Sequence, residues 1–339
     1  MNMYTIFTVT KEDLARLSSS EAVDRFRDLL WAEATALGIG KNQINVSTAI
    51  TISDGGVDAV VRDVSAGGGQ GIIKAGLTCY QIKTGDYALS KKANIRKILF
   101  TPKSKGKELE PKVKSCLDKD GILVVVLFGW DNPGKKDIEE YTHSFREELT
   151  KFDEHYANAR IEVWLPNQLM GFFNTFPSLA LRVKGLEDTL FQSHQSWSLN
   201  DDMQRIFERS SEQEKMITSL QTAMRQSNGA THIHVRGEAG IGKTRCVLEA
   251  TSVNDLSPLV IYCNDASKFR DSNLMYALLR EDNHTSAILV IDECHPENRF
   301  LIWNRLKHRG SRIKLITIYN EFGLPSSDIV CLDTPPLTS

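Results

Sequence analysis

His232-Ile-His-Val-Arg-Gly237-Glu-Ala-Gly-Ile-Gly-Lys243-Thr244 is the stretch that decides the fold of this 339-residue chain. Five strand-like residues come first, the pattern GxxxxGK[ST] follows, and a helical stretch begins directly after it. In that context glycines let backbone N–H groups turn inward around phosphates, and the following helix presents its positive N-terminal end. The stretch therefore predicts a nucleotide-binding P-loop.

Each residue of this loop has an expected task. Gly237, Gly240 and Gly242 allow the tight turn, and Lys243 is expected to reach the β and γ phosphates of ATP. The hydroxyl of Thr244 is expected to coordinate Mg²⁺. These five residues form the predicted cofactor site.

Two further segments complete the expected nucleotide site. The apolar run Ala287–Ile291 ends in Asp292-Glu293, so Asp292 is expected to hold Mg²⁺ and Glu293 to orient the attacking water. Asn320 follows the strand-like Lys314–Ile318, where it would probe the γ-phosphate. Asp292-Glu-Cys-His295 also spells a DExH box, which leaves a helicase as an alternative.

The second half of the chain alternates short apolar runs with helical stretches. This alternation predicts a parallel sheet with covering helices, an α/β fold. The strand-like runs are His232–Arg236, Leu259–Tyr262, Ala287–Ile291, Lys314–Ile318 and Ile329–Leu332.

The first half has a different pattern. An amphipathic helix over 20–37 precedes five strand-like runs, and Gly-rich Ala66–Gly71 predicts a hairpin tip between the second and third. The runs are Ile44–Ile52, Val57–Val64, Leu77–Thr84, Ile122–Phe128 and Ile161–Leu165. A polar stretch then predicts a linker at 191–204, which separates a domain at 1–190 from one at 205–339.

Composition narrows the class of protein. Hydrophobic content of 41% and charged content of 25% are typical of a soluble globular chain, and no apolar run is long enough to span a bilayer. We therefore expect a cytoplasmic protein without a membrane partner. The six cysteines form no CxxC pair, so no zinc site is expected. Segment 91–119 holds ten Lys or Arg against three acids, which favours a polyanion partner.

Three residues of the first half suggest phosphodiester chemistry. Gln81 and Lys83 lie on one face of their strand, and pairing across the hairpin would bring Asp58 close to them. A carboxylate can hold Mg²⁺ against a phosphate, while a lysine positions water and offsets developing charge. The alternative is an exposed Asp58–Lys83 ion pair, worth well under 1 kcal/mol.

Gly56-Val-Asp58 and Gln81-Ile-Lys83 resemble the PD-(D/E)xK nucleases, particularly Mrr-like restriction enzymes and CD-NTase-associated nuclease domains. The resemblance implies a restriction-endonuclease-like mixed sheet and a second metal ligand on the preceding helix, for which Glu33 is the candidate. Gln81 replaces the commoner acid, so Glu33 becomes more important to the metal site. Asp54 is the rival ligand.

Residues 205–339 resemble the STAND branch of AAA-like ATPases, through a helix bearing Arg209, the P-loop, and the strands ending at Asp292 and Asn320. In that family a helical lid and sensing repeats follow, and here they would lie beyond Ser339.

A nuclease joined to a STAND ATPase resembles the antiviral Avs proteins. The resemblance implies an ATP- and Mg²⁺-dependent switch, double-stranded DNA as substrate, a phage protein as trigger, and a homo-oligomer, a tetramer, on activation. The alternatives are a helicase or translocase with a nuclease head, and a non-cleaving, nucleic-acid-binding signalling ATPase.

Overall fold

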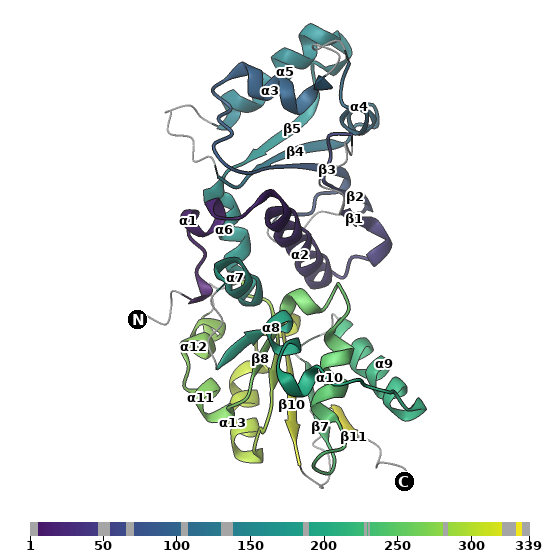
Figure 1. Ribbon diagram of the computed structural model, residues 1–339, viewed down its shortest axis with the longest axis vertical. Helices are drawn as coiled ribbons and strands as arrows, with labels where there is room; N and C mark the ends of the chain where they lie inside the picture. The colour runs from purple at the N-terminus through teal and green to yellow at the C-terminus, as the bar shows by residue number, and fades with distance from the viewer. Residues whose placement is uncertain are drawn as a thin grey trace. The chain divides into compact units, whose positions relative to one another are not determined.

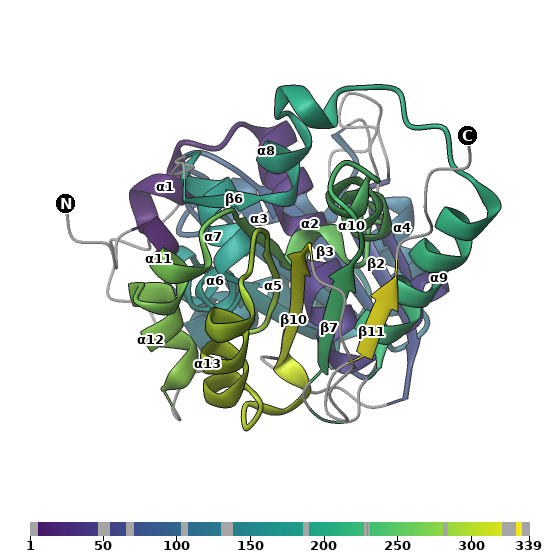
Figure 2. The same cartoon turned by 90° about the horizontal axis from the view of Figure 1, so that it is seen from below.

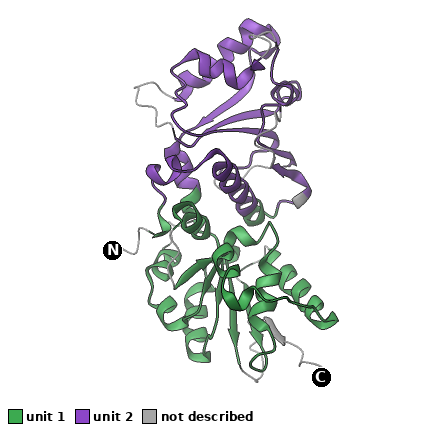
Figure 3. Cartoon of the chain, viewed as in Figure 1, with its two compact units in different colours: residues 1–8, 34–38, 173–339 green, residues 9–33, 39–172 purple. Residues whose placement is uncertain are grey.

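The protein is described here by a computed structural model that covers residues 6–46, 55–65, 71–102, 108–129, 138–185, 190–226, 229, 231–280, 284–320 and 330–333. The chain divides into two compact units (Figures 1 and 3). Unit 1 comprises Met1–Thr8, Ala34–Gly38 and Phe173–Ser339, and unit 2 comprises Val9–Glu33 and Ile39–Phe172. Both are α/β, as predicted.

Unit 2 is built on a mixed five-stranded sheet of order β1-β2-β3-β4-β5. The first three strands pair antiparallel, and β3, β4 and β5 pair parallel. The strands are β1 (Ile44–Val46), β2 (Ala59–Val64), β3 (Gly76–Lys83), β4 (Ile122–Leu127) and β5 (Arg160–Trp164). The helices that begin in this unit are α1 (Lys11–Ala15), α2 (Ser19–Leu37), α3 (Lys92–Leu99), α4 (Pro111–Leu117), α5 (Ile138–Phe152) and α6 (Pro166–Asn174).

Both faces of this sheet are covered. Helices α3, α4 and α5 bury one face through a cluster that includes Ile98, Cys116 and Phe145 packed with Cys79 and Val125. On the other face the rings of Phe26 in α2, Tyr80 and Trp164 lie within 6.4 Å of one another. This two-sided burial explains why β4 is apolar throughout.

Unit 1 is built on a six-stranded sheet of order β11-β7-β10-β9-β8-β6, and Figure 2 shows β11, β7 and β10 side by side. All neighbours pair parallel except β6, which is antiparallel to β8. The strands are β6 (Phe191–Ser193), β7 (Thr231–Arg236), β8 (Val260–Cys263), β9 (Ala287–Ile291), β10 (Ile313–Tyr319) and β11 (Val330–Asp333). The helices are α7 (Pro177–Lys184), α8 (His194–Ser198), α9 (Ser211–Arg225), α10 (Lys243–Thr251), α11 (Ala266–Arg270), α12 (Asn273–Leu279) and α13 (Pro296–Leu306).

The predicted linker at 191–204 is wrong. Phe191 is buried and begins β6, and Trp197 is buried in α8 with its ring stacked on Tyr262 at 4.4 Å. Leu181 in α7 packs in one core cluster with Phe191. Burial of these apolar side chains joins the segment to unit 1, whose longest part begins at Phe173 rather than near residue 205.

Every predicted strand has a counterpart, with ends that shift by a few residues. Strand β2 begins at Ala59, so Asp58 precedes it instead of lying within it. The predicted hairpin tip, most of Ile44–Ile52 beyond Val46, and Asp54 lie outside the described residues. Among the helices that the structure describes, none is long and apolar enough to cross a membrane.

Candidate functional site

The P-loop connects the end of β7 to the start of α10. Gly237, Gly240 and Gly242 have φ values of 147°, 82° and 88°, a region that side chains with a Cβ rarely adopt. Gly242 is the N-cap of α10 and provides no side-chain cap. Helix ends of this kind bind anions such as phosphate through their first backbone N–H groups.

Lys243 is folded back onto its own loop. Its Nζ donates to the carbonyl oxygens of Gly237 (3.1 Å) and Glu238 (2.6 Å) and to Oδ1 of Asn320 (2.6 Å). Burial lowers the pKa of Lys243, while the charges of Asp292 and Glu293 oppose that shift. All three N–H groups of the ammonium donate to neutral oxygens, two of the backbone and one of the Asn320 side-chain amide.

The strand that carries Asn320 brings the separate parts of this site together. Strand β10 lies between β7 and β9, so the carboxyl ends of all three parallel strands lie at one edge of the sheet. The hydroxyl of Thr244 donates to Oδ2 of Asp292 at 2.9 Å, and the Tyr262 hydroxyl donates to the same oxygen at 3.2 Å. Sequence analysis did not identify Tyr262.

Glu293 occupies a strained backbone position at this edge. Its φ is 48°, and its side chain is exposed, whereas Asp292 is buried. The N–H of Asp292 donates to Cys263 O and the N–H of Cys294 to Ile318 O, both at 2.9 Å. Neighbouring strands thus hold the chain on both sides of Glu293, which directs its carboxylate away from the core.

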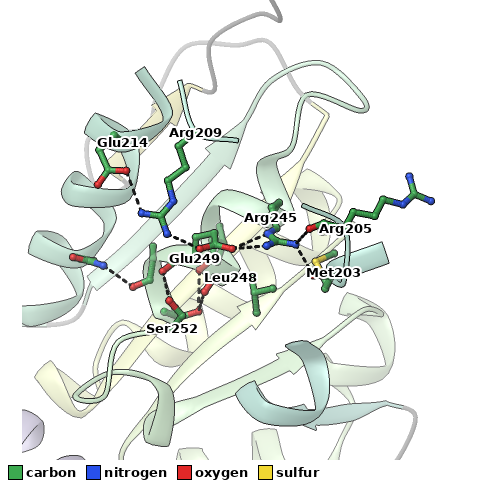
Figure 4. Close-up of polar contacts among 12 residues, drawn as sticks. Met203, Arg205, Arg209, Glu214, Arg245, Leu248, Glu249 and Ser252 are labelled. Atoms are coloured by element: carbon green, nitrogen blue, oxygen red, sulfur yellow. Dashed lines mark hydrogen bonds and ion pairs between the residues drawn. The ribbon is translucent and has the colours of Figure 1, made fainter. Parts of the chain in front are cut away.

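An ion-pair network anchors the segment before α9 to the P-loop helix (Figure 4). The carboxylate of Glu249 forms ion pairs with the guanidinium groups of Arg245 and Arg209, at N···O distances of 2.7 Å and 2.6 Å. Arg245 also donates to the carbonyl of Arg205 at 3.0 Å, and its guanidinium lies 5.2 Å from the Phe207 ring centroid. Sequence analysis singled out Arg209 alone, although the i, i+4 spacing of Arg245 and Glu249 was a visible signal.

A buried polar chain lies beneath the P-loop. Arg299 donates to Nε2 of His234 at 2.7 Å, and because arginine has no acceptor, that nitrogen must be unprotonated. Nδ1 of His234 then donates to Thr317, whose hydroxyl also contacts Nε2 of His232 at 2.8 Å. Burial is the main cause that lowers the pKa of His232 to about 3, and the charge of Arg299 adds to it.

In unit 2, Asp58 lies beside the strand that carries Gln81 and Lys83, as predicted. Its N–H donates to Tyr80 O at 2.9 Å, and its Oδ2 accepts from the N–H of Ile82 at 2.6 Å. The carboxylate is thus held at the level of the Gln81-Ile-Lys83 motif by backbone contacts.

A glycine turn places Asp58 there. Gly55 and Gly56 have φ values of 77° and 83°, and Gly55 O accepts from the N–H of Lys112 at 3.0 Å. A Cβ added to Gly56 would lie 2.6 Å from Cβ of Glu110, the N-cap residue of α4. Only glycine fits this approach.

Gln81 and Lys83 differ in their surroundings. Gln81 is 3% exposed, and its Oε1 has no hydrogen-bond partner among the described residues. Nζ of Lys83 lies 6.0 Å from the Tyr87 ring centroid, its one recorded side-chain contact within the described part of the chain. Gln81 therefore offers a buried oxygen, and Lys83 an ammonium that no carboxylate of the described ranges pairs with.

Glu33 is buried in α2, the helix that packs on the Tyr80 face of β3. Burial is the main cause that raises the pKa of Tyr80, and the charge of Glu33 contributes to it. Gln81 follows Tyr80 in the strand and points to the opposite face. Across the described ranges, no cluster of three or more His, Cys, Asp or Glu side chains forms a metal site. Glu33 as a second ligand stays a prediction.

A cationic pocket borders Asp58 on the α4 side of the sheet. Arg62, Lys112 and Lys119 line it, and none of the three has a recorded side-chain ion pair within the described residues. The polar and thiol side chains of the lining are Asn45, Cys79, Ser115 and Cys116. Lys112 and Lys119 are the residues of the basic segment 91–119 that line this pocket within the described ranges. Lys103, Lys105 and Lys107 lie outside the described residues.

Together, the strand order and loop geometry of unit 1 define an α/β P-loop fold. No family model and no curated protein matches this sequence. The solved structure of C. elegans PCH-2 aligns with a TM-score of 0.33 and 11% identity, over 44% of this chain and 48% of that one. The match spans about half of the PCH-2 chain, and at this TM-score it carries no argument about function.

Proposed function

We propose that this chain is a nucleotide-controlled DNA nuclease of an antiphage defence system, with unit 1 as the ATP-binding switch and unit 2 as the nuclease. The observation that carries the proposal is the set of contacts at the sheet edge of unit 1. There Lys243 binds Asn320, and Thr244 binds Asp292, across 77 and 48 residues of sequence. Lys243 and Thr244 lie at the start of α10, and Asp292 and Asn320 directly follow the parallel strands β9 and β10.

The P-loop has the donors that a triphosphate requires. When ATP binds, Lys243 would exchange the carbonyl groups of Gly237 and Glu238 for phosphate oxygens. Hydrogen bonds between charged groups are about twice as strong as those to neutral acceptors, so the exchange favours binding. Asn320 would keep Lys243 aligned during this change.

The oxygen atoms beside the loop fit Mg²⁺. Thr244 Oγ1 and Asp292 Oδ2 are hard donors 2.9 Å apart, and magnesium prefers such ligands together with phosphate oxygens. A bound Mg²⁺ would neutralise phosphate charge there. Glu293, exposed at the same strand end, would orient the water that attacks the γ-phosphate.

The nuclease half of the proposal is supported by chemistry gathered at one end of β3. Asp58 and Oε1 of Gln81, which has no hydrogen-bond partner among the described residues, are oxygen ligands that fit Mg²⁺. Lys83 would position the attacking water and offset negative charge at the scissile phosphate. Arg62, Lys112 and other cations of the adjacent pocket would bind the DNA backbone.

The two halves would work as a switch. A phage protein would trigger assembly of a homo-oligomer, a tetramer, in the cytoplasm, and the clustered nuclease units would then cut double-stranded DNA. Clustering raises the local concentration of nuclease units on DNA without any new contact at the catalytic residues.

The test is plasmid cleavage with Mg²⁺ by the native full-length protein, with its trigger and ATP. Lys83→Ala should abolish cleavage, and because Lys83 has only a weak ring contact, the variant should unfold at nearly the wild-type temperature. Lys151→Ala, an exposed lysine of α5, is the matched control. If Lys83→Ala cuts as fast as Lys151→Ala, the nuclease assignment is wrong.

A non-cleaving signalling ATPase is the second candidate, and the 2.6 Å bond from Ile82 N–H to Asp58 favours it, because a structural role alone would explain that carboxylate. Asp58→Asn keeps an oxygen acceptor and removes the charge. If the protein is a nuclease, this variant should lose phage protection. If it is a non-cleaving signalling ATPase, the variant should keep that protection.

A further inference from the structure

The cationic pocket of unit 2 lies between α4 and the first three strands of the sheet. Asn45, Val60 and Cys79 are directly opposite one another across β1, β2 and β3, so their side chains share the α4 face of the sheet. Cys79 is buried, Val60 is partly buried and Asn45 is exposed. Helix α4 therefore covers β3 and leaves β1 open, and the pocket occupies the step between them.

One side of α4 faces this pocket. Lys112, Ser115 and Cys116 are three and four residues apart, which places them on the same side of the helix, and Lys119 joins them from the turn that follows. Lys114 lies on another side, where it pairs with Asp118 at 2.7 Å. The helix thus directs two of its lysines to the pocket and a third away from it.

The inner and outer parts of the pocket differ in their chemistry. Val57, Cys79 and Cys116 form its floor, and each is at most 4% exposed. The three cations Arg62, Lys112 and Lys119 are exposed and form its rim. A cationic rim above an apolar floor fits a ligand that joins an anionic group to a less polar one.

The charge of the lining indicates which anion fits. Three cations and one carboxylate, Asp58, give the pocket a formal charge of +2. Oδ2 of Asp58 accepts from the N–H of Ile82, and none of the three cations has a recorded side-chain ion pair within the described ranges. A phosphomonoester carries a charge of about −1.5 to −2 at pH 7, with three acceptor oxygens. A phosphodiester of the DNA backbone carries a single negative charge. The charge of the pocket therefore matches a monoester better than a diester.

The size of the pocket limits the ligand further. Its volume is about 160 Å³. A protein cavity of about 150 Å³ accommodates one benzene ring. The pocket therefore has room for a phosphate group and the sugar attached to it, and not for a DNA duplex.

We propose that this pocket binds a phosphomonoester dianion, carried either by a free nucleoside monophosphate or by the phosphorylated end of a DNA strand. Arg62, Lys112 and Lys119 would donate to the phosphate oxygens, and the floor would contact the attached sugar.

The inference deepens the proposed nuclease and rests on it for its role. Hydrolysis of a phosphodiester adds water, breaks one P–O bond, and leaves one hydroxyl and one phosphomonoester. The pocket borders Asp58, so a ligand of this class would lie beside the proposed catalytic residues. It would be there as the end of a cut strand or as a nucleotide that competes with DNA.

The experiment is calorimetric titration of the full chain with thymidine 5′-monophosphate, in EDTA. A Lys243→Ala background keeps the P-loop from competing for the nucleotide. The nucleotide should bind, its methyl phosphodiester should bind more weakly, and thymidine should not bind. Arg62→Ala should weaken binding about tenfold, because it removes a charge-assisted hydrogen bond, and Lys119→Glu about a hundredfold. Lys114→Ala on the same helix is the matched control and should bind as the background protein does.

A second titration separates the two sources of the ligand. If an oligothymidylate with a 5′-phosphate binds more tightly than the same strand with a 5′-hydroxyl, the pocket takes strand ends. If the two strands bind equally, it takes the free nucleotide.

Two results would overturn the proposal. In the first, thymidine 5′-monophosphate at millimolar concentration binds no more tightly than thymidine, a comparison that depends on no pocket variant. In the second, Arg62→Ala and Lys119→Glu, both exposed positions, unfold at the same temperature as Lys114→Ala and bind the nucleotide equally well. The readout is binding without Mg²⁺ and not DNA cleavage, so the pocket and the proposed nuclease can fail separately.

Discussion

The two predicted sites are held by different kinds of contact. In unit 1 the predicted side chains bind one another, Lys243 to Asn320 and Thr244 to Asp292. In unit 2 Asp58 accepts a hydrogen bond from the backbone N–H of Ile82 and donates one to the carbonyl of Tyr80. Direct contacts between the predicted side chains support the proposed nucleotide site through its geometry. Backbone contacts do not distinguish a catalytic Asp58 from a structural one, so the proposed nuclease site depends more on a chemical test.

The difference follows from how each site is encoded. The P-loop is one contiguous motif, and the order β7-β10-β9 brings the two other strand ends to it. The unit 2 site depends on a glycine turn that packs on α4 and on a hairpin partner. A glycine turn and a hairpin partner also occur where no catalytic site is present, so together they are weaker evidence for a nuclease site than the P-loop is for a nucleotide site.

The largest expected effect is on nucleotide binding. Lys243→Ala should weaken ATP affinity by about 3–6 kcal/mol, or roughly 100-fold or more, because each charge-assisted hydrogen bond to a phosphate contributes about 1.5–3 kcal/mol. Isothermal titration calorimetry with ATP and Mg²⁺ measures it. The exposed Lys215→Ala on α9 is the matched control, and equal affinities of the two variants would refute the P-loop assignment.

The next effect concerns the turn that positions Asp58. Gly56→Ala should destabilise unit 2 by about 2–4 kcal/mol, because its φ of 83° disfavours a Cβ and that Cβ would meet Glu110 at 2.6 Å. Gly171→Ala is the control in α6, with open space around the added Cβ, and should stabilise by about 0.5–1 kcal/mol. Denaturant unfolding of the two variants gives both values, and a Gly56→Ala protein as stable as wild type would show that the turn is not required.

The sequence predicted the strands well because the apolar runs are long and bounded by polar residues. It missed β6, since Phe191-Gln-Ser193 is too short to show alternation, and its pairing with β8 is not visible locally. In the site, Tyr262 was missed because a tyrosine within an apolar run looks like core. Its contact with Asp292 depends on strand order, which spacing does not encode.

The stability of unit 1 should depend on pH through His232. The unfolded chain protonates His232 below about pH 6.5, whereas the folded chain does so only near pH 3, so stability of unit 1 falls as the pH decreases between these values. The slope from this one proton is at most about 1.4 kcal/mol per pH unit.

Thermal unfolding from pH 4 to pH 7 measures the slope. His232→Gln removes the titrating group and should flatten the pH dependence of the unit 1 transition, while the exposed His308→Gln should leave it unchanged. The same slope in both variants would mean that other groups control acid stability.

The smallest expected effect is in the network that anchors the segment before α9. A double-mutant cycle should give a coupling of about 1 kcal/mol for Arg209 with Glu249, but below about 0.5 kcal/mol for Arg209 with Glu214, because exposed pairs are screened. The side chain of Glu249 is 16% exposed and that of Glu214 is 56% exposed. Unfolding at low and high salt measures both. If the two coupling energies are equal, the Arg209–Glu249 pair acts only as surface charge, and the stabilising side-chain contacts of unit 1 are confined to the P-loop. If the Arg209–Glu249 coupling is larger, those contacts continue along α10 to residues that no phosphate would touch.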